Sequence, residues 1–261
     1  MDVPENEVRE CEGRPRPEGV EVGPGPDPQA PGAYTACMSA HSLSRSLRDA
    51  VDPIWRAQLE HPFVRGIADG TLDDERFARW VRQDYLYLKE FARIFAWAVA
   101  KSDRLASMSW YAGVLDLTLN TEMALHRSYA ERFGISESEL EAEAMWPTTR
   151  AYTDFLVRTS ADGDMADLLA ALLPCSWGYL FVARGMASWG TSPDDRYADW
   201  VAMYTSDEFA EAADWLRTEL DREAGGASDD KLARLRDIFT VSSRYEWQFW
   251  EMCWTGESWT P

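Results

Sequence analysis

The sequence has little lysine and histidine and no long uninterrupted hydrophobic segment. Only three of its 26 basic residues are lysine, and only three residues are histidine. No apolar run approaches the ~20 residues that a membrane-spanning helix needs. The four cysteines form no C-x-x-C pair and are preceded by no secretory signal, which favours a reducing compartment over a disulfide scaffold. We therefore expect a soluble, cytoplasmic protein.

Several motifs and charge patterns are absent too. The sequence contains no glycine-rich phosphate loop, no G-x-S-x-G elbow and no H-E-x-x-H motif. A net charge of -19 argues against nucleic acid and anionic membranes as partners, because such a chain cannot neutralise phosphates over a continuous surface. The acid-rich, lysine-poor composition fits a protein from a high-salt cytosol, and it also fits an ordinary acidic, arginine-rich cytosolic protein.

Composition divides the chain into two parts. Residues 1–40 hold seven of the 13 prolines, five glycines and no tryptophan, so they cannot bury enough apolar area to offset their ordering entropy. We expect a flexible tail there, or an upstream extension whose true start is Met38. Residues 41–261 contain all 13 tryptophans and enough apolar sequence for one large core.

The second part has helical periodicity nearly throughout. Apolar residues recur at helical spacing in 43–59, a turn-rich connector is expected from His61 to Gly70, and Asp73 can cap a long helix over about 74–101. No window shows strand-like alternation, so we predict a single all-α domain. Further helices are expected at about 105–133, 136–144, 148–160, 164–189, 194–204, 207–223 and 229–254.

Two carboxylates fall on stripes that should face the core. Asp84 lies on the inward stripe of the helix at 74–101, and Glu246 lies on that of the helix at 229–254. Burying a carboxylate raises its pKa and is unfavourable unless a partner stabilises it. Each is therefore either a functional group, with Glu246 suited to general acid work near neutral pH, or a structural residue satisfied by an arginine or, for Asp84, a tyrosine.

Cys175 lies in an apolar helical pattern directly after Pro174, which should kink or start a helix and free backbone polar groups beside the thiol. A lone cysteine on such a face is an ordinary core residue or a nucleophile. No histidine is placed to activate it, so Glu246 or a substrate nitrogen must take its proton.

Glu122 and His126 stand at i, i+4, a metal-binding spacing. Without a second such motif we interpret them as a pair at the helix surface, or one that supports other site residues, and expect no metal.

Several ordered motifs from about residue 43 to 259 resemble the TenA family, the thiaminase II and aminopyrimidine aminohydrolase group. They are His61-Pro62-Phe63-Val64, Gly66 to Leu72, Gln83-Asp84-Tyr85 with Tyr87-Leu88, Glu122 to His126, Leu172-Leu173-Pro174-Cys175, and Ser242-Ser243 with Tyr245-Glu246 and Phe249-Trp250. The resemblance implies a haem-oxygenase-like multi-helix bundle without haem, assembled as a homotetramer. It also implies a cofactor-free hydrolase of the cysteine-containing subclass that cleaves the C–N bond of aminopyrimidines in thiamine salvage. The expected substrate is 4-amino-5-aminomethyl-2-methylpyrimidine, which is converted to the hydroxymethyl form, and thiamine is expected to be a slower substrate.

The resemblance also implies roles for individual residues. Cys175 would be the nucleophile that adds to the pyrimidine ring, Glu246 the proton donor and acceptor, and Asp84 the partner of the exocyclic amine and the adjacent ring nitrogen. Four tyrosines would line the substrate pocket: Tyr87, Tyr152, Tyr179 and Tyr204. The alternatives are a non-catalytic pyrimidine-binding or regulatory protein and a di-iron oxidase on the same fold.

Overall fold

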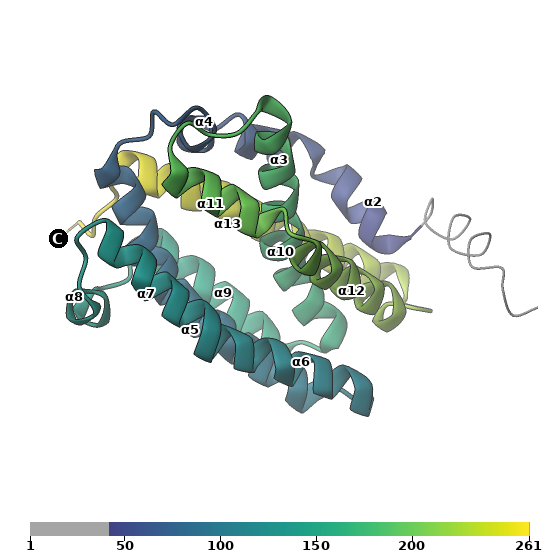
Figure 1. The fold of residues 1–261 in the computed structure, drawn as a ribbon. Coiled ribbons are helices and arrows are strands. Elements are labelled where there is room, and N and C mark those ends of the chain that lie inside the picture. Colours follow the sequence, from purple (N-terminus) through teal and green to yellow (C-terminus); the bar gives the residue numbers. More distant parts are fainter. Residues whose placement is uncertain (1–41, 261) are drawn as a thin grey trace, which may run out of the picture. The chain divides into compact units, whose positions relative to one another are not determined.

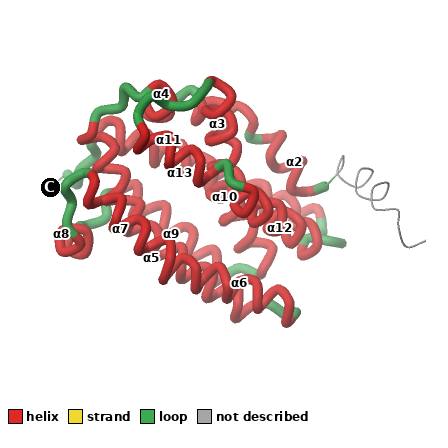
Figure 2. The backbone as a smooth tube through the Cα atoms, in the orientation of Figure 1, coloured by secondary structure: helices red, strands yellow, loops and turns green. Residues whose placement is uncertain are grey.

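The computed structural model describes residues 42–260, and every regular element in this range is helical (Figures 1 and 2). The all-α prediction is therefore confirmed for this part of the chain, whereas the expected tail at residues 1–40 lies outside the described residues. In chain order the elements are α2 (Leu43–Ala50), α3 (Asp52–Leu59), α4 (Pro62–Asp69), α5 (Asp74–Lys101), α6 (Leu105–Leu117), the π-helical segment η2 (Thr118–Glu122), α7 (Met123–Arg132), α8 (Glu137–Ala142), α9 (Pro147–Asp162), α10 (Met165–Trp189), α11 (Asp195–Tyr204), α12 (Asp207–Glu223) and α13 (Asp229–Thr255).

Helix α10 forms the centre of the bundle. It contacts α9, α11, α12 and α13, and buried residues occur all around it, as expected for a helix that is apolar on every side. Contrary to the expectation from the sequence, α10 is long and apolar enough to cross a membrane by length and composition alone. However, 83% of its apolar window is buried within the domain, which makes it a core helix.

The other helices cover α10 from different sides. In Figure 1, α5, α6 and α7 lie below α10, and α3, α4 and α11 lie above it. Helix α5 contacts α6, α7 and α9, while α13 contacts α5, α9 and α10. This arrangement brings the middle of α5, α10 and α13, which carry the three candidate catalytic residues, to one region of the interior.

The segment from His61 to Gly70 forms helix α4 rather than the predicted turn-rich connector. His61 caps the first turn, because its Nδ1 accepts a hydrogen bond from the backbone N–H of Phe63 at 3.1 Å. Pro62 occupies the start of the helix, where the missing N–H is not needed. Gly70 ends the helix with φ 71°, a conformation that glycine adopts without strain. The proline and the glycine therefore mark the two ends of a helix.

The structure confirms some of the other predicted helix boundaries and refines others. Asp73 caps α5 as predicted, and its Oδ1 accepts a hydrogen bond from the Arg76 backbone N–H at 2.9 Å. Helix α10 continues through Pro174 and does not start there. The predicted helix over 105–133 contains the π-helical segment η2. A π-helical turn accommodates an additional residue and changes which side chains face inward after it.

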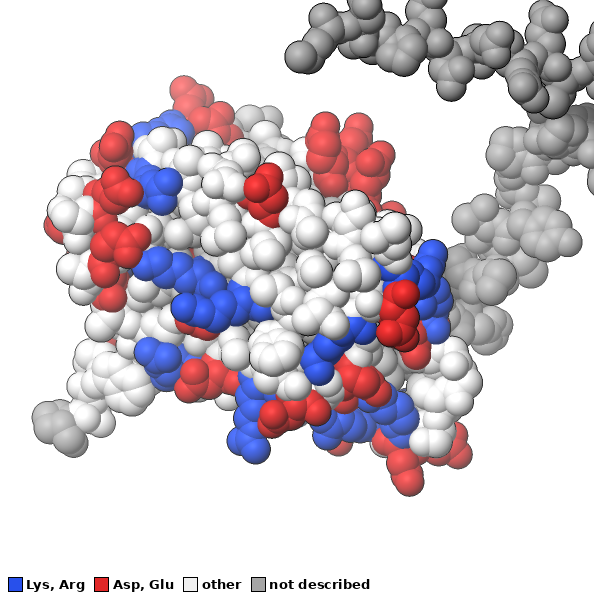
Figure 3. Space-filling model, turned by 90° about the horizontal axis from the view of Figure 1, so that it is seen from below, with Lys and Arg blue, Asp and Glu red and all other residues white. Residues whose placement is uncertain are grey.

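Charged side chains are distributed over the surface with both signs mixed. Figure 3 shows one face of the domain, on which acidic and basic side chains alternate with uncharged areas. Several arginines pair with nearby carboxylates, for example Arg132 with Asp199 at 3.2 Å. This face presents no continuous basic area of the kind that binds phosphates.

Candidate active site

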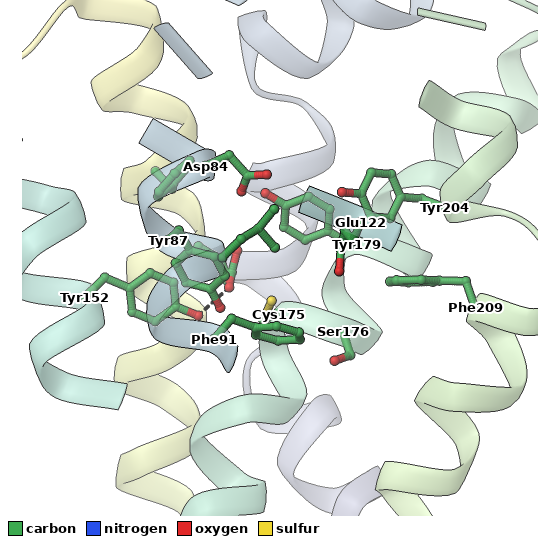
Figure 4. A pocket seen from close by; sticks show the side chains of 13 residues that line it. Asp84, Tyr87, Phe91, Glu122, Tyr152, Cys175, Ser176, Tyr179, Tyr204 and Phe209 are labelled. Atoms are coloured by element: carbon green, nitrogen blue, oxygen red, sulfur yellow. Dashed lines mark hydrogen bonds between the residues drawn. The ribbon is translucent and has the colours of Figure 1, made fainter. Parts of the chain in front are cut away.

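One cavity in the bundle collects side chains from seven helical elements (Figure 4). About 480 Å³ of empty space, part of it open to solvent, lies between its lining residues. All seven site residues predicted from the sequence line it. The complete lining is Asp84, Tyr87, Leu88, Phe91, Glu122, Tyr152, Cys175, Ser176, Tyr179, Tyr204, Phe209, Glu246 and Phe249.

Cys175 projects from α10 and is partly exposed to the cavity, so it is not sealed in packed hydrocarbon. Burial raises the pKa of its thiol well above the ordinary value, and the nearby Glu246 carboxyl raises it further. The Tyr87 hydroxyl lies next to the sulfur, outside good hydrogen-bond geometry, and its effect is to lower the pKa of the thiol. Burial dominates, so the thiol is neutral in the empty cavity and needs a base before it can act as a nucleophile.

Glu246 projects from α13 and is 2% exposed. The Tyr152 hydroxyl donates a hydrogen bond to Glu246 Oε1. The Ser242 hydroxyl lies 3.2 Å from the Tyr152 hydroxyl and donates a hydrogen bond to the Ala171 carbonyl at 2.6 Å. Burial raises the pKa of Glu246 to about 7, although the bond from Tyr152 lowers it. The partner of Glu246 is thus a tyrosine and not the arginine of the structural alternative, and the carboxyl can both give and take a proton near neutral pH.

Asp84 projects from α5 and is 6% exposed. His126 Nδ1 lies 3.7 Å from its Oδ2. The other ring nitrogen, Nε2, lies 2.7 Å from the Val81 carbonyl oxygen, which only accepts hydrogen bonds, so Nε2 carries the proton and Nδ1 is bare when the ring is neutral. Burial lowers the pKa of His126 to about 4. Asp84 therefore faces a neutral imidazole and has no arginine partner among the described residues.

The electrostatic environment of Asp84 is set by these neighbours. Burial raises the pKa of its carboxyl well above the ordinary value, and Glu122 and Glu246 raise it further. These effects favour the protonated form of the carboxyl, which presents one hydrogen-bond donor and one acceptor to the cavity. That pair matches an amine next to an aromatic ring nitrogen.

The four predicted tyrosines form aromatic walls. The ring centroids of Tyr87 and Tyr152 are 5.5 Å apart, and those of Tyr179 and Tyr204 are 5.1 Å apart. Figure 4 shows the first pair on one side of the Cys175 sulfur and Tyr204 on the other. Burial raises the pKa of all four hydroxyls well above the ordinary value, so they stay neutral and offer hydrogen bonds and ring faces to a flat ligand.

The structure adds lining residues that the sequence did not reveal. Glu122 lies on the cavity wall and His126 is 8% exposed beneath Asp84. Of the two predicted placements of this pair, the helix surface is therefore wrong, whereas support of other site residues agrees with the position of His126 beside Asp84. The i, i+4 spacing was the available signal, but the π-helical segment that turns Glu122 inward was not visible in it. Phe91 and Phe209 also line the cavity, and no pattern separates such aromatic residues from ordinary core. Among residues 42–260, no three His, Cys, Asp or Glu side chains come together as metal ligands.

Comparison with known proteins assigns the chain to a family. The model of the TENA/THI-4/PQQC family matches residues 48–256. The chain belongs to this family. An aminopyrimidine aminohydrolase from Halalkalibacterium halodurans is 44% identical over 221 residues, which cover 84% of this chain and 98% of that protein.

Solved structures agree with this assignment. A TenA homologue from P. horikoshii OT3 superposes with a TM-score of 0.78 at 28% identity, covering 83% of this chain and 100% of that one. A domain from Shewanella denitrificans with a heme oxygenase-like fold gives a TM-score of 0.65 at 16% identity, covering 84% and 94%, and shows the fold alone. The family and the haem-oxygenase-like bundle predicted from the sequence are confirmed.

The cavity of this TenA chain combines three chemical capacities. It holds a thiol, a buried carboxyl whose pKa of about 7 allows it to donate and accept protons, and a second carboxyl that can pair with the edge of a ring. Aromatic side chains surround these groups. Such a site can add a nucleophile to a flat, neutral heterocycle without leaving uncompensated charge in the interior.

Proposed function

We propose that this TenA protein is an aminopyrimidine aminohydrolase. It hydrolyses the exocyclic C–N bond of 4-amino-5-aminomethyl-2-methylpyrimidine to give the hydroxymethyl compound, a reaction of thiamine salvage, and thiamine is a second substrate. The observation that carries the proposal is that Cys175, Glu246 and Asp84 line one aromatic cavity. The 44% identity with an aminopyrimidine aminohydrolase over most of both chains supports it.

In the proposed complex the pyrimidine ring lies between the tyrosine walls. One Asp84 oxygen accepts a hydrogen bond from the exocyclic 4-amino group, and the protonated oxygen donates to the adjacent ring nitrogen. The raised pKa of Asp84 and the bare Nδ1 of His126 support this protonation state. A ligand without this donor and acceptor pair leaves the buried carboxyl unpaired, which disfavours its binding.

The first chemical step is addition of Cys175 to the ring. The thiol gives its proton to the Glu246 carboxylate, and the sulfur forms a bond to an electron-poor ring carbon. The displaced electron pair of the ring moves to a ring nitrogen, which takes the proton back from Glu246. Because the proton moves together with the electrons, no net charge develops in the cavity.

The second step releases the amine. The bond between the exocyclic methylene and the nitrogen of the protonated amine breaks, and its electron pair leaves with the nitrogen as ammonia. Water then adds to the methylene: its hydroxyl stays there, and its proton passes to Glu246 and from Glu246 to the released ammonia. Loss of the sulfur and of the proton on the ring restores the aromatic pyrimidine and the free thiol beside the Glu246 carboxylate, so the net reaction converts the protonated amine and water into alcohol and ammonium.

Turnover of defined substrates tests the proposal. Purified protein is incubated with the aminomethyl pyrimidine and, separately, with thiamine, and the hydroxymethyl pyrimidine is followed by mass spectrometry. We expect product from the aminomethyl compound and slower release from thiamine. Tight binding of both compounds without any product would instead establish a pyrimidine-binding or regulatory protein.

We further propose that the protein is a cytoplasmic homotetramer, as its similarity to the TenA family led us to expect. Leucines are exposed along α6, η2 and α7, among them Leu105 at 81%, Leu117 at 58% and Leu119 at 51%. Apolar side chains concentrated in one region favour an interface. Sedimentation equilibrium should give four times the 29.7 kDa chain mass, and Leu117→Glu should lower the oligomeric state.

Free thiols at Cys175 and Cys253 are consistent with a reducing location, which cell fractionation tests.

A further inference from the structure

Glu122 is the one cavity carboxylate to which the proposed reaction gives no role. It belongs to the π-helical segment between α6 and α7, and π-helical turns often occur at functional sites. Among the described residues no lysine, arginine or histidine forms an ion pair with it, although it lines the cavity. Burial raises the pKa of its carboxyl, and a hydrogen bond from the Thr118 side chain lowers it. An acidic group held here without a cation is unfavourable unless a ligand compensates it.

The cavity around Glu122 is lined by several acidic groups and by no basic group of the described chain. Three carboxyl groups line it, those of Asp84, Glu122 and Glu246, whereas no lysine, arginine or histidine of the described chain does. In the proposed complex, the edge of the neutral pyrimidine ring pairs with Asp84, and Glu246 exchanges a proton with the ring. The third carboxyl is then free to meet the remaining part of the substrate, the group attached to the exocyclic methylene.

Glu122 also marks the boundary with a second cavity. About 790 Å³ of empty space, part of it open to solvent, lies between the residues that line this cavity, which shares Glu122 and Tyr204 with the first. Its walls include the indoles of Trp80 and Trp200, and aromatic faces attract cations. Its one arginine, Arg132, pairs with Asp199 at 3.2 Å. A cationic group larger than ammonium can therefore extend past Glu122 and still meet favourable surroundings.

Glu122 lies where it can contact the leaving group of a pyrimidine bound next to the Cys175 thiol. Figure 4 shows Glu122 on the Tyr204 side of the cavity, with Tyr152 across from it beyond the Cys175 sulfur. Glu246 accepts a hydrogen bond from Tyr152 and so lies on that opposite side. The two glutamates thus flank a bound ring, one positioned for proton transfer and the other for the substituent that departs.

We propose that Glu122 is the specificity-determining residue that binds the positive charge of the leaving group. The proposal rests on the function proposed above, and it restricts the substrates to pyrimidines whose exocyclic methylene carries a cation, either a protonated amine or a thiazolium ring. A protonated amine needs no further proton to depart as ammonia, because the C–N electron pair alone completes the neutral molecule. By pairing with the ammonium group, Glu122 keeps the amine in this form in the cavity.

Comparison of two nearly identical ligands tests this assignment. The aminomethyl pyrimidine and the hydroxymethyl pyrimidine differ in one terminal group, which is charged in the first and neutral in the second. Their dissociation constants are measured by calorimetry at neutral pH with full-length Cys175→Ala protein, which the proposed mechanism renders unable to turn over either ligand. We expect about 10- to 100-fold tighter binding of the amine, the range for a buried charged hydrogen bond.

The decisive variant adds Glu122→Gln, which preserves shape and removes the charge. We expect the preference for the amine to fall to about 3-fold or less, while the affinity for the alcohol changes little. A matched control is Glu131→Gln, which removes an exposed carboxylate at the end of the same helical run, and we expect it to keep the full preference. Thermal unfolding of each variant confirms that it is folded.

Three outcomes would overturn the assignment, and they are distinguishable. Equal binding of amine and alcohol by the parent protein, or a preference that survives Glu122→Gln, contradicts the role of Glu122 and leaves the proposed hydrolase function intact. Failure of both pyrimidines to bind contradicts the proposed function itself. If Glu122→Gln unfolds the protein, Glu122→Asp, which keeps the charge, must fold and retain a preference of at least about 10-fold.

Discussion

The buried carboxyl of Glu246 makes the stability of this protein depend on pH, and Glu246→Gln removes that dependence. Burial raises the pKa of this carboxyl from 4.5 to about 7 in the folded protein. In the unfolded chain the carboxyl regains its ordinary value. Because the folded protein holds the proton more tightly than the unfolded chain, stability is highest at low pH and is lost as the pH rises through this interval.

The magnitude is set by the size of the pKa change. A rise from 4.5 to about 7 corresponds to about 3 kcal/mol of stability lost at alkaline pH. Between about pH 5.5 and 8.5 the loss is about 2 kcal/mol, because the unfolded carboxyl is already largely ionised at the lower pH. The glutamine variant still accepts a hydrogen bond from Tyr152 but never ionises.

Urea unfolding followed by circular dichroism measures the effect. We expect the stability of Glu246→Gln relative to wild type to increase by about 2 kcal/mol between about pH 5.5 and 8.5. Titrating groups remote from Glu246 contribute equally to both proteins and cancel in the difference. Glu131→Gln, which removes an exposed carboxylate, should show no such increase. A constant difference between wild type and Glu246→Gln, or a variant less stable than wild type at the higher pH, would refute the reasoning.

Three further predictions concern the site and one turn of the fold. Tyr152→Phe removes the hydrogen bond that lowers the pKa of Glu246, so the acid limb of the pH profile of kcat/KM should move up by about one pH unit. Asp84→Ala should weaken binding of the hydroxymethyl pyrimidine about 100-fold in calorimetry, whereas Asp84→Asn, which offers the same donor and acceptor as a protonated carboxyl, should stay within about 10-fold. Gly70→Ala should lower the unfolding free energy by about 2 kcal/mol in urea, because the new Cβ would lie 2.7 Å from a proline ring at φ +71°; Gly134→Ala, at the same φ in open space, should lower it by about 1 kcal/mol.

Helical periodicity reveals the catalytic candidates because each lies on the apolar stripe of a long, regular helix. Asp84 and Glu246 are carboxylates at positions where the stripe requires burial, and Cys175 is a thiol in a long apolar helix. The structure places all three at one cavity. Periodicity gives the direction of each side chain but not the distances between helices, so the prediction of their convergence rested on the family resemblance.

The features that sequence reasoning missed depend on local geometry. Pro62 and Gly70 are typical turn residues, yet the eight residues from Pro62 to Asp69 make a complete short helix between them. One of the two predicted placements of Glu122, at a helix surface, assumes regular α-helical spacing through Thr118–Glu122, where the backbone is π-helical. A single inserted residue rotates the positions after it around the helix axis, and no residue type in that segment marks the insertion.

The most direct test of the proposed mechanism compares the rate of hydroxymethyl pyrimidine formation by wild type, Cys175→Ala and Cys253→Ala. Loss of Cys175 should lower kcat at least about 1,000-fold, as expected for removal of a nucleophile. Loss of Cys253, a buried free thiol outside the cavity lining, should leave kcat within about 3-fold of wild type. Hydrolysis by folded Cys175→Ala at the wild-type rate would contradict a covalent mechanism at this site.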